Sequence, residues 1–391
     1  MVTTRWTDEL LDELSQEGDP EADEVIAAHL AATAVEPRQL LSNLARHLHL
    51  PPDQRSAPVE AYLAEQPPWP AWVDPVKMRR SADFFDQNGL LIGTALFCAS
   101  LPEAYAGARG ARVLTLTARL VTDTVRRVYE TAQMLVDSMT RDGLVPGTGA
   151  GYDDVRRVRL MHAAVRHLIL DDPEVRKTQT PEPLPSWCVT AGLPLNQEDM
   201  LGALMTFTQT VFESLDHLGA VYTPDEADAY LHAWCVVGHF IGIRPDLLPL
   251  TLDDARELTT AIRRRQYKVS EDGALLADAL VTAMRSSIRW RILRPLPAAL
   301  VRRLVGPDVA ADIGLGRRGA FGVLFDTTAR LMRVVGLAER RNKMLRVISR
   351  HLAAGILDAF VRAGREGNRP PFSLPTQLAA QVSDAKPRWT I

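Results

Sequence analysis

Hydrophobic positions recur every three or four residues along most of the chain, which is the spacing of amphipathic α-helices. Residues 1–50 fit two or three short helices. Residues 76–98 are apolar nearly all round and predict a central buried helix, which Leu101-Pro102-Glu103 should end. Further helices are expected over the ranges 111–140, 157–170, 197–219, 224–244, 251–267, 272–291, 295–306, 318–335 and 339–364. Without a series of strands or an internal repeat, this pattern predicts an all-α fold in one multi-helix globular domain.

Proline and glycine divide this pattern into regions. The run QPPWPAW (66–72) predicts a strap packed on the core, because tryptophans stand among its prolines. A glycine-rich loop over 143–154 lies between two helical segments, as in a helix pair that converges on a site. Residues 171–195 are irregular and proline-rich, which is typical of a pocket wall or lid. The expected regions are N-terminal helices with the strap (1–75), a helical core (76–271), C-terminal helices packing on it (272–366) and an extended tail (367–391).

Composition and charge narrow the classes of function. The chain has 391 residues with a net charge of −3, so it lacks the basic field that nucleic acid would require. Its three cysteines, Cys98, Cys188 and Cys235, form neither a disulfide framework nor a CxxC metal site. No uncharged apolar run approaches the roughly 20 residues of a membrane helix, and the acidic N-terminus does not resemble a signal peptide. We therefore expect a cytoplasmic protein without a membrane span, unless an export segment has been trimmed away.

The stretch RVRLMHAAVRHLIL (157–170) carries the strongest candidate for chemistry. His162 lies on an apolar stripe formed by Val158, Met161, Val165 and Ile169. Arg159 and Arg166 lie one turn before and one turn after the imidazole, on nearly the same face. A histidine on an apolar wall between two cations suits a haem, with the imidazole as iron ligand and the arginines as propionate partners. The alternative is a core histidine with two surface arginines, which the stretch taken alone favours.

A second group lies on the helix before the glycine-rich loop. Arg127 and Thr131 are one turn apart, and Glu130 is three residues from Arg127. Facing a metal-bound histidine, such side chains could hold water or dioxygen and supply a base. An intrahelical Arg–Glu pair on a solvated face is the alternative. Other motifs fail: the GxGxxG match at 314–319 follows no strand and is better explained as a helix stop, and HExxH and ExxH pairs are absent.

The motif MHAAVRHLIL resembles the signature of the latex-clearing protein family, the haem b-dependent rubber oxygenases, which share their domain with the MpaB-type oxygenases. The family places RxxxT about thirty residues before the histidine of RxxxHAAVRHL, as Arg127-x-x-x-Thr131 and His162 do here. ADAYLHAWCVVGHFIG (227–242), the segment near Arg5 and the strap ending in Trp72 are also similar. The likeness spans about residues 5 to 320 and implies a globin-like helical haem pocket.

The resemblance assigns roles residue by residue. It implies that His162 is the proximal haem ligand and that Arg127 and Thr131 lie on the distal side. The family has a lysine before that threonine, where this chain has Glu130, and this puts the closed six-coordinate state and rubber activity in doubt. The family's catalytic glutamate corresponds by offset to Ala111; Glu103 could take the role only if a short insertion separates it from the helix.

The implied activity is cleavage of C=C bonds in polyisoprene, or in a smaller hydrophobic isoprenoid-type substrate, by dioxygen and haem b. A haem-binding sensor without catalysis, or a helical interaction module without haem, are the alternatives. The oligomeric state is not predicted.

Overall fold

The structure is a computed structural model, which describes residues 4–32, 56–120, 134–171, 192–286, 291 and 294–316. These ranges contain helices and no β-strand, and a single isolated bridge joins Gly107 to Tyr267, so the all-α prediction is confirmed. The helices are α1 (Asp8–Ser15), α2 (Pro20–Ala32), α4 (Ala57–Ala64), α5 (Pro75–Ala95), η3 (Leu96–Ser100), α6 (Leu101–Ala106), α7 (Ala108–Leu120), α9 (Ala150–Asp171), α11 (Gln197–Phe207), α12 (Gln209–Leu218), α13 (Pro224–Phe240), η5 (Pro245–Leu247), α14 (Leu252–Gln266), α15 (Glu271–Ser286) and α16 (Leu296–Asp312).

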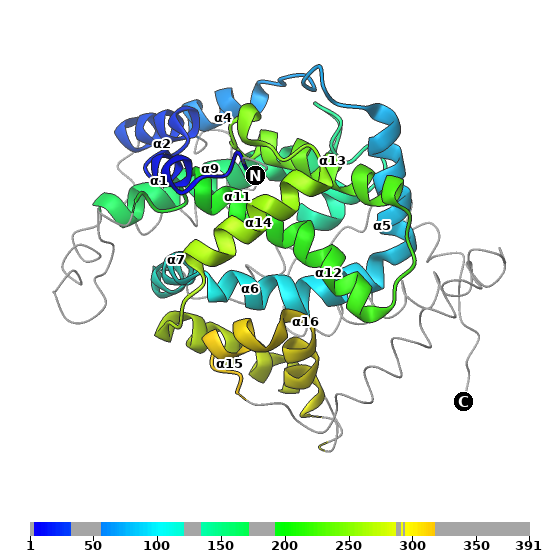
Figure 1. Ribbon diagram of the computed structural model, residues 1–391. Coiled ribbons are helices and arrows are strands. Elements are labelled where there is room, and N and C mark those ends of the chain that lie inside the picture. Colours follow the sequence, from blue (N-terminus) through cyan, green and yellow to red (C-terminus); the bar gives the residue numbers. More distant parts are fainter. Residues whose placement is uncertain are drawn as a thin grey trace, which may run out of the picture.

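Helix α5 runs along α13 and continues through the π-helical turn η3 into α6 (Figure 1). The predicted end at Leu101-Pro102-Glu103 is therefore wrong. In η3 the Leu101 N–H bonds to Leu96 O, and Pro102 stands in the first turn of α6, where a missing N–H is tolerated. The wider turn thus lets the chain pass the proline without leaving the helical direction. The prediction of a buried helix was also too strong, since only five of the 21 residues of α5 are buried.

Two other helices of the structure differ in extent from the predicted ones. The expected helix 197–219 breaks at Thr208, whose φ of −120° and ψ of −80° are not helical, giving α11 and α12. The expected helix 295–306 extends to Asp312 across a kink at Gly306, where φ is 81° and Pro307 follows. Gly314 and Gly316 then adopt positive φ, so the described start of the GxGxxG match lies just beyond a helix end, as predicted.

One main hydrophobic core joins α1, α5, α9, α11, α12, α13 and α14. Tyr230 and Trp234 of α13 are completely buried in it, with Phe207 stacked on Trp234 at 4.6 Å between ring centroids. A second cluster lies between α2, α4, α7 and α9 and contains Leu160 and Ile169. Helix α9 therefore contributes to both clusters, and α13 packs beside it.

The proline-rich strap packs on this core, as predicted. The Trp69 indole N–H donates to Leu144 O at 2.6 Å. Trp72 meets the imidazoles of His232 and His239 edge to face. His232 Nε2 also accepts the backbone N–H of Asp74, the residue that caps α5. The strap therefore connects the start of α5 to α13 and to the glycine-rich loop.

Helices α15 and α16 form a layer below α6 and contact it directly (Figure 1). The division into regions with boundaries at 75, 271 and 366, in which the C-terminal helices pack on the core, stays a prediction. The expected helices 318–335 and 339–364, the tail from 367, and most of the irregular segment 171–195 lie outside the described residues.

One continuous helix among the described residues, Pro75–Ala106, is long and apolar enough to cross a membrane by length and composition alone. Half of its most apolar window is buried inside the protein. A core helix of a soluble protein meets the same criterion, so this is weak evidence for a span.

Candidate functional site

Helix α9 carries His162 and begins where the chain is closely packed. A Cβ on Gly151 would lie 2.4 Å from the backbone of Ser138, and one on Gly149 would lie 2.2 Å from Gly143 O. Only glycine permits these approaches, which bring the helical segment 134–139 against the first turn of α9. The two helical segments therefore pack against each other at the glycine-rich loop, and their convergence on a site stays a prediction.

His162 is half-buried at the middle of α9. Val158, Val165 and Ile169 share its face at helical spacing; Val165 and Ile169 are buried in the second cluster, and Val158 packs on the main core. The apolar stripe predicted from the sequence therefore serves partly as a packing surface. An imidazole that is neither fully buried nor fully exposed, with valines beside it, has the donor chemistry that haem iron requires. The residues described on this side fit a haem, and His162 as its ligand stays a prediction.

Arg159 and Arg166 are held by carboxylates from the start of α2. Arg159 donates from Nε to Asp19 Oδ2 at 2.6 Å, and from Nη2 to Asp19 Oδ1 and to Glu21, each at 2.8 Å. Arg166 pairs with Asp23 at 2.8 Å and donates from Nη1 to Leu195 O at 2.8 Å. We call these five charged residues the α2–α9 junction. Contact of both arginines with haem propionates stays a prediction. The sequence did not indicate the carboxylate partners that the two arginines have in the structure.

Local sequence explains why three carboxylates gather there. Asp19 precedes Pro20 at the start of α2; its carbonyl accepts from Asp23 N at 2.9 Å. Aspartate before a proline at the first helical position is a strong start signal, and acidic residues in the first turn complement the helix dipole. The segment GDPEAD (18–23) therefore begins α2 and presents its negative charges to α9.

Glu103, the alternative predicted base, lies in a buried network far along the chain from His162. Its side chain is 4% exposed and pairs with Arg263 at 2.9 Å. Thr210 Oγ1 and the Tyr267 hydroxyl donate to Glu103 Oε2 at 2.7 and 3.1 Å. Arg263 also binds Glu213 at 2.7 Å. These contacts join α6, α12 and α14, so the Glu103 side chain holds helices together; a catalytic role for Glu103 stays a prediction.

Arg127, Glu130 and Thr131 lie outside the described residues, so the predicted distal group is not placed. Among the described residues no three His, Cys, Asp or Glu side chains gather so that they could hold a metal ion. A haem can be held by a single protein ligand, and the proposed one is His162. A cavity of about 250 Å³ lies between Trp69, Met78, Met139 and Asp142, and none of the predicted site residues lines it. It is also smaller than the ~300–1,000 Å³ of typical ligand sites.

Sequence reasoning missed one titratable pair near the start of α9. Burial raises the pKa of Asp154 to about 6, the nearby Arg157 cation opposes this shift, and the Asp137 carboxylate adds to it. Asp154 lies eight residues before His162, about 12 Å along the helix axis. No recognisable sequence motif links Asp137 to Asp154 across the glycine-rich loop. The two segments come together through the close packing of Gly151 on Ser138, which the sequence does not reveal.

Fold and site together define an all-α protein in which a long helix, shared by two core clusters, offers the half-buried imidazole of His162 as a donor. A sequence model of the family described as "ER-bound oxygenase mpaB/B'/Rubber oxygenase, catalytic domain" matches residues 78–336. The chain belongs to this family and is accordingly an oxygenase.

Two relatives extend the comparison. The chain is 25% identical over 304 residues to a rubber oxygenase of Streptomyces sp. (strain K30), a match that covers 77% of this chain and 71% of that protein. The fold of this chain is similar to that of the latex clearing protein LCP in the closed state, with a TM-score of 0.63 and 23% sequence identity. The match covers 82% of this chain and 83% of the LCP chain. Predicted resemblance to the rubber oxygenases, made on the motif around His162, is thus confirmed.

Proposed function

We propose that this oxygenase is haem b-dependent and cleaves C=C bonds of a hydrophobic isoprenoid-type substrate such as polyisoprene. The observation that carries the proposal is the position of His162, half-buried on α9 inside the motif that resembles the family signature. The match to the family across 78–336 and to a rubber oxygenase over 77% of the chain supports the reaction class.

Individual residues then have distinct tasks. His162 would hold the iron, and Val158 and Val165 would exclude water beside the imidazole. By resemblance, Arg127, Glu130 and Thr131 would face the dioxygen side and orient the substrate. When bound, haem b supplies the activation of dioxygen that inserts both oxygen atoms across the C=C bond. The chain's contribution is to hold the imidazole, close the site to water and align an apolar alkene.

Two measurements on the purified full chain test this proposal. A Soret band together with a pyridine haemochrome spectrum of haem b is expected. Dioxygen consumption should then rise on addition of polyisoprene latex or of short terpenes, with carbonyl products in the extract. A haem protein that consumes no dioxygen with any of these alkenes would instead be a non-catalytic haem-binding protein, and a chain without haem would overturn the proposal.

A further inference from the structure

The carboxylates of the α2–α9 junction bind helix α9 on both sides of His162. Arg159 lies three residues before the imidazole and Arg166 four residues after it, so the two contacts are separated by about two helical turns with His162 between them. Each arginine is bound by a carboxylate of α2, Asp19 in one case and Asp23 in the other. Two fixed points on one helix restrict both its rotation and its sliding, which a single contact would not do.

The first of these points is buried and closely fitted. The Asp19 side chain is 5% exposed and meets the Arg159 fork through both of its oxygens. Gly242, with φ of 101°, lies so close that a Cβ there would stand 2.2 Å from Asp19 Oδ2 and 2.9 Å from Arg159 Nε. Because the backbone after α13 approaches the ion pair this closely, the two side chains have little room for another arrangement.

Gln197 fixes the surrounding backbone. It is 1% exposed, and its Nε2 donates to Gly18 O at 2.8 Å and to Gly242 O at 3.0 Å. Its Oε1 accepts from Arg244 N at 3.0 Å, and its own N–H donates to Glu17 O at 2.8 Å. The residue that begins α11 therefore ties the turn before Asp19 to the turn after α13. The backbone next to Asp19 is thus held independently of α9.

We propose that Asp19 and Asp23 are positioning residues for His162, which they orient through Arg159 and Arg166. This inference rests on the proposed function, in which His162 is the iron ligand. It assigns the two arginines a task different from contact with propionates: the Nε and Nη2 of Arg159 are already engaged by α2. The N-terminal segment, which precedes the family match at residue 78, then becomes part of the machinery of the site.

The test compares Asp19→Asn with Glu198→Gln in the full chain. Glu198 is a matched control, because it is 1% exposed and pairs with Arg109 and Arg265, but none of its hydrogen-bond or ion-pair partners lies on α9. Asp19→Asn is expected to weaken haem binding by about 10-fold, the size seen for residues that orient a metal ligand from behind. It should also change the EPR spectrum of the ferric haem, which reports the orientation of the imidazole plane. Glu198→Gln should leave both unchanged.

Further variants keep the inference testable if Asp19→Asn does not fold. Arg159→Lys keeps the positive charge and loses the two-pronged contact, and it should produce the same spectral change with a smaller loss of affinity. Asp12→Asn removes an exposed partner of Arg265, outside the junction, and should change neither. If Asp19→Asn and Arg159→Lys both bind haem with the affinity and EPR spectrum of the wild type, the inference is overturned while the proposed function stands. A wild-type chain without haem would overturn both.

Discussion

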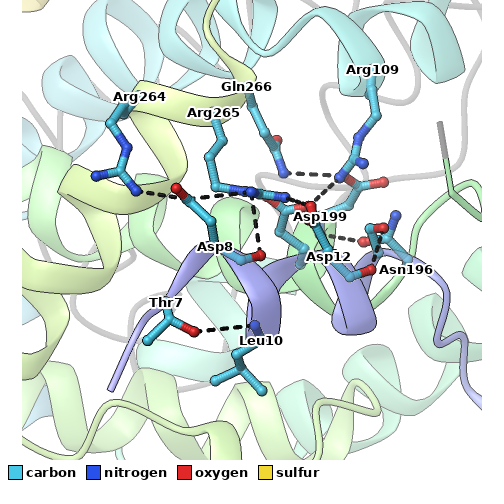
Figure 2. Close-up of polar contacts among 12 residues, drawn as sticks. Thr7, Asp8, Leu10, Asp12, Arg109, Asn196, Asp199, Arg264, Arg265 and Gln266 are labelled. Atoms are coloured by element: carbon cyan, nitrogen blue, oxygen red, sulfur yellow. Dashed lines mark hydrogen bonds and ion pairs between the residues drawn. The ribbon is translucent and has the colours of Figure 1, made fainter. Parts of the chain in front are cut away.

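Two N-terminal helices are fastened to the body of the protein by arginine–carboxylate pairs, and they differ in burial and in what they hold. Helix α1 is bound through Arg265, which reaches Asp12 at 2.5 Å and Glu198 at 3.0 Å, and through Arg264, which reaches Asp8 at 2.7 Å (Figure 2). We call this group the α1–α14 clasp. Its α1 carboxylates are largely exposed, whereas Asp19 in the α2–α9 junction is almost completely buried.

This difference in burial predicts which ion pairs matter most for the stability of the protein. An exposed ion pair contributes roughly 0–1 kcal/mol, because water and salt screen it. A buried pair contributes little relative to an apolar pair of the same shape, but the loss of one partner leaves a charge without compensation. The exposed members of the clasp, Asp8, Asp12 and Arg264, should therefore tolerate single substitutions. The junction should not, and the helix that it holds is the one that carries His162.

Removal of one arginine from each region gives the largest expected contrast. Arg159→Ala leaves the Asp19 carboxylate buried without its cation and should lower the free energy of unfolding by about 3–5 kcal/mol. Arg264→Ala removes an ion pair whose side chains are 62% and 56% exposed and should cost less than about 1 kcal/mol. Urea unfolding of both variants measures these costs. Equal losses would show that burial of Asp19 does not distinguish the two regions.

A glycine substitution sharpens the same contrast without changing charge. Gly242→Ala places a methyl group against Asp19 at a positive φ and should destabilise the chain by about 1–3 kcal/mol. Gly93→Ala is the matched control: the position is helical in α5 and a Cβ there would meet no atom of the described residues within 4 Å, so alanine should stabilise by about 0.5–1 kcal/mol. Thermal unfolding of the two variants should therefore shift in opposite directions, and a stabilising Gly242→Ala would refute the close fit at the junction.

The smallest expected effect is a dependence on pH at the junction. Burial lowers the pKa of His239, and the Arg159 charge lowers it further, against the opposing influence of Glu21. Since the unfolded state binds the proton more readily, stability should fall as the pH drops below about 6.5, the ordinary histidine pKa. His239→Gln should reduce this loss between pH 7.5 and pH 5.5 in urea unfolding. A wild-type stability that rises on acidification, or a slope that His239→Gln leaves unchanged, would contradict the assignment.

Much of the fold could be predicted from periodicity and caps. The Thr223-Pro224-Asp225-Glu226 start of α13 forms the complete capping box in the structure, and Thr251 caps α14 through Asp254 N. The π-helical turn before Pro102 could not be predicted, because the sequence shows only a proline. The helix continues past this proline through a local change of backbone hydrogen bonding, which has no sequence signal.

The site was predictable only in part. His162, Arg159 and Arg166 could be grouped because they share one helix. Their carboxylate partners lie about 140 residues earlier, and local spacing carries no information about such pairs. The predicted group Arg127, Glu130 and Thr131 lies outside the described residues and stays a prediction that rests on resemblance.

The central claim is that His162 is the protein ligand of a haem, and one measurement tests it most directly. The visible spectra of His162→Ala and His167→Ala are compared with that of the wild type, all purified as full chains. His167 is a second half-buried histidine of α9, on another face of the helix from His162. The wild type and His167→Ala should show the same Soret band, and His162→Ala should lack it or regain it only with added imidazole. A Soret band of wild-type position and intensity in His162→Ala would contradict the claim.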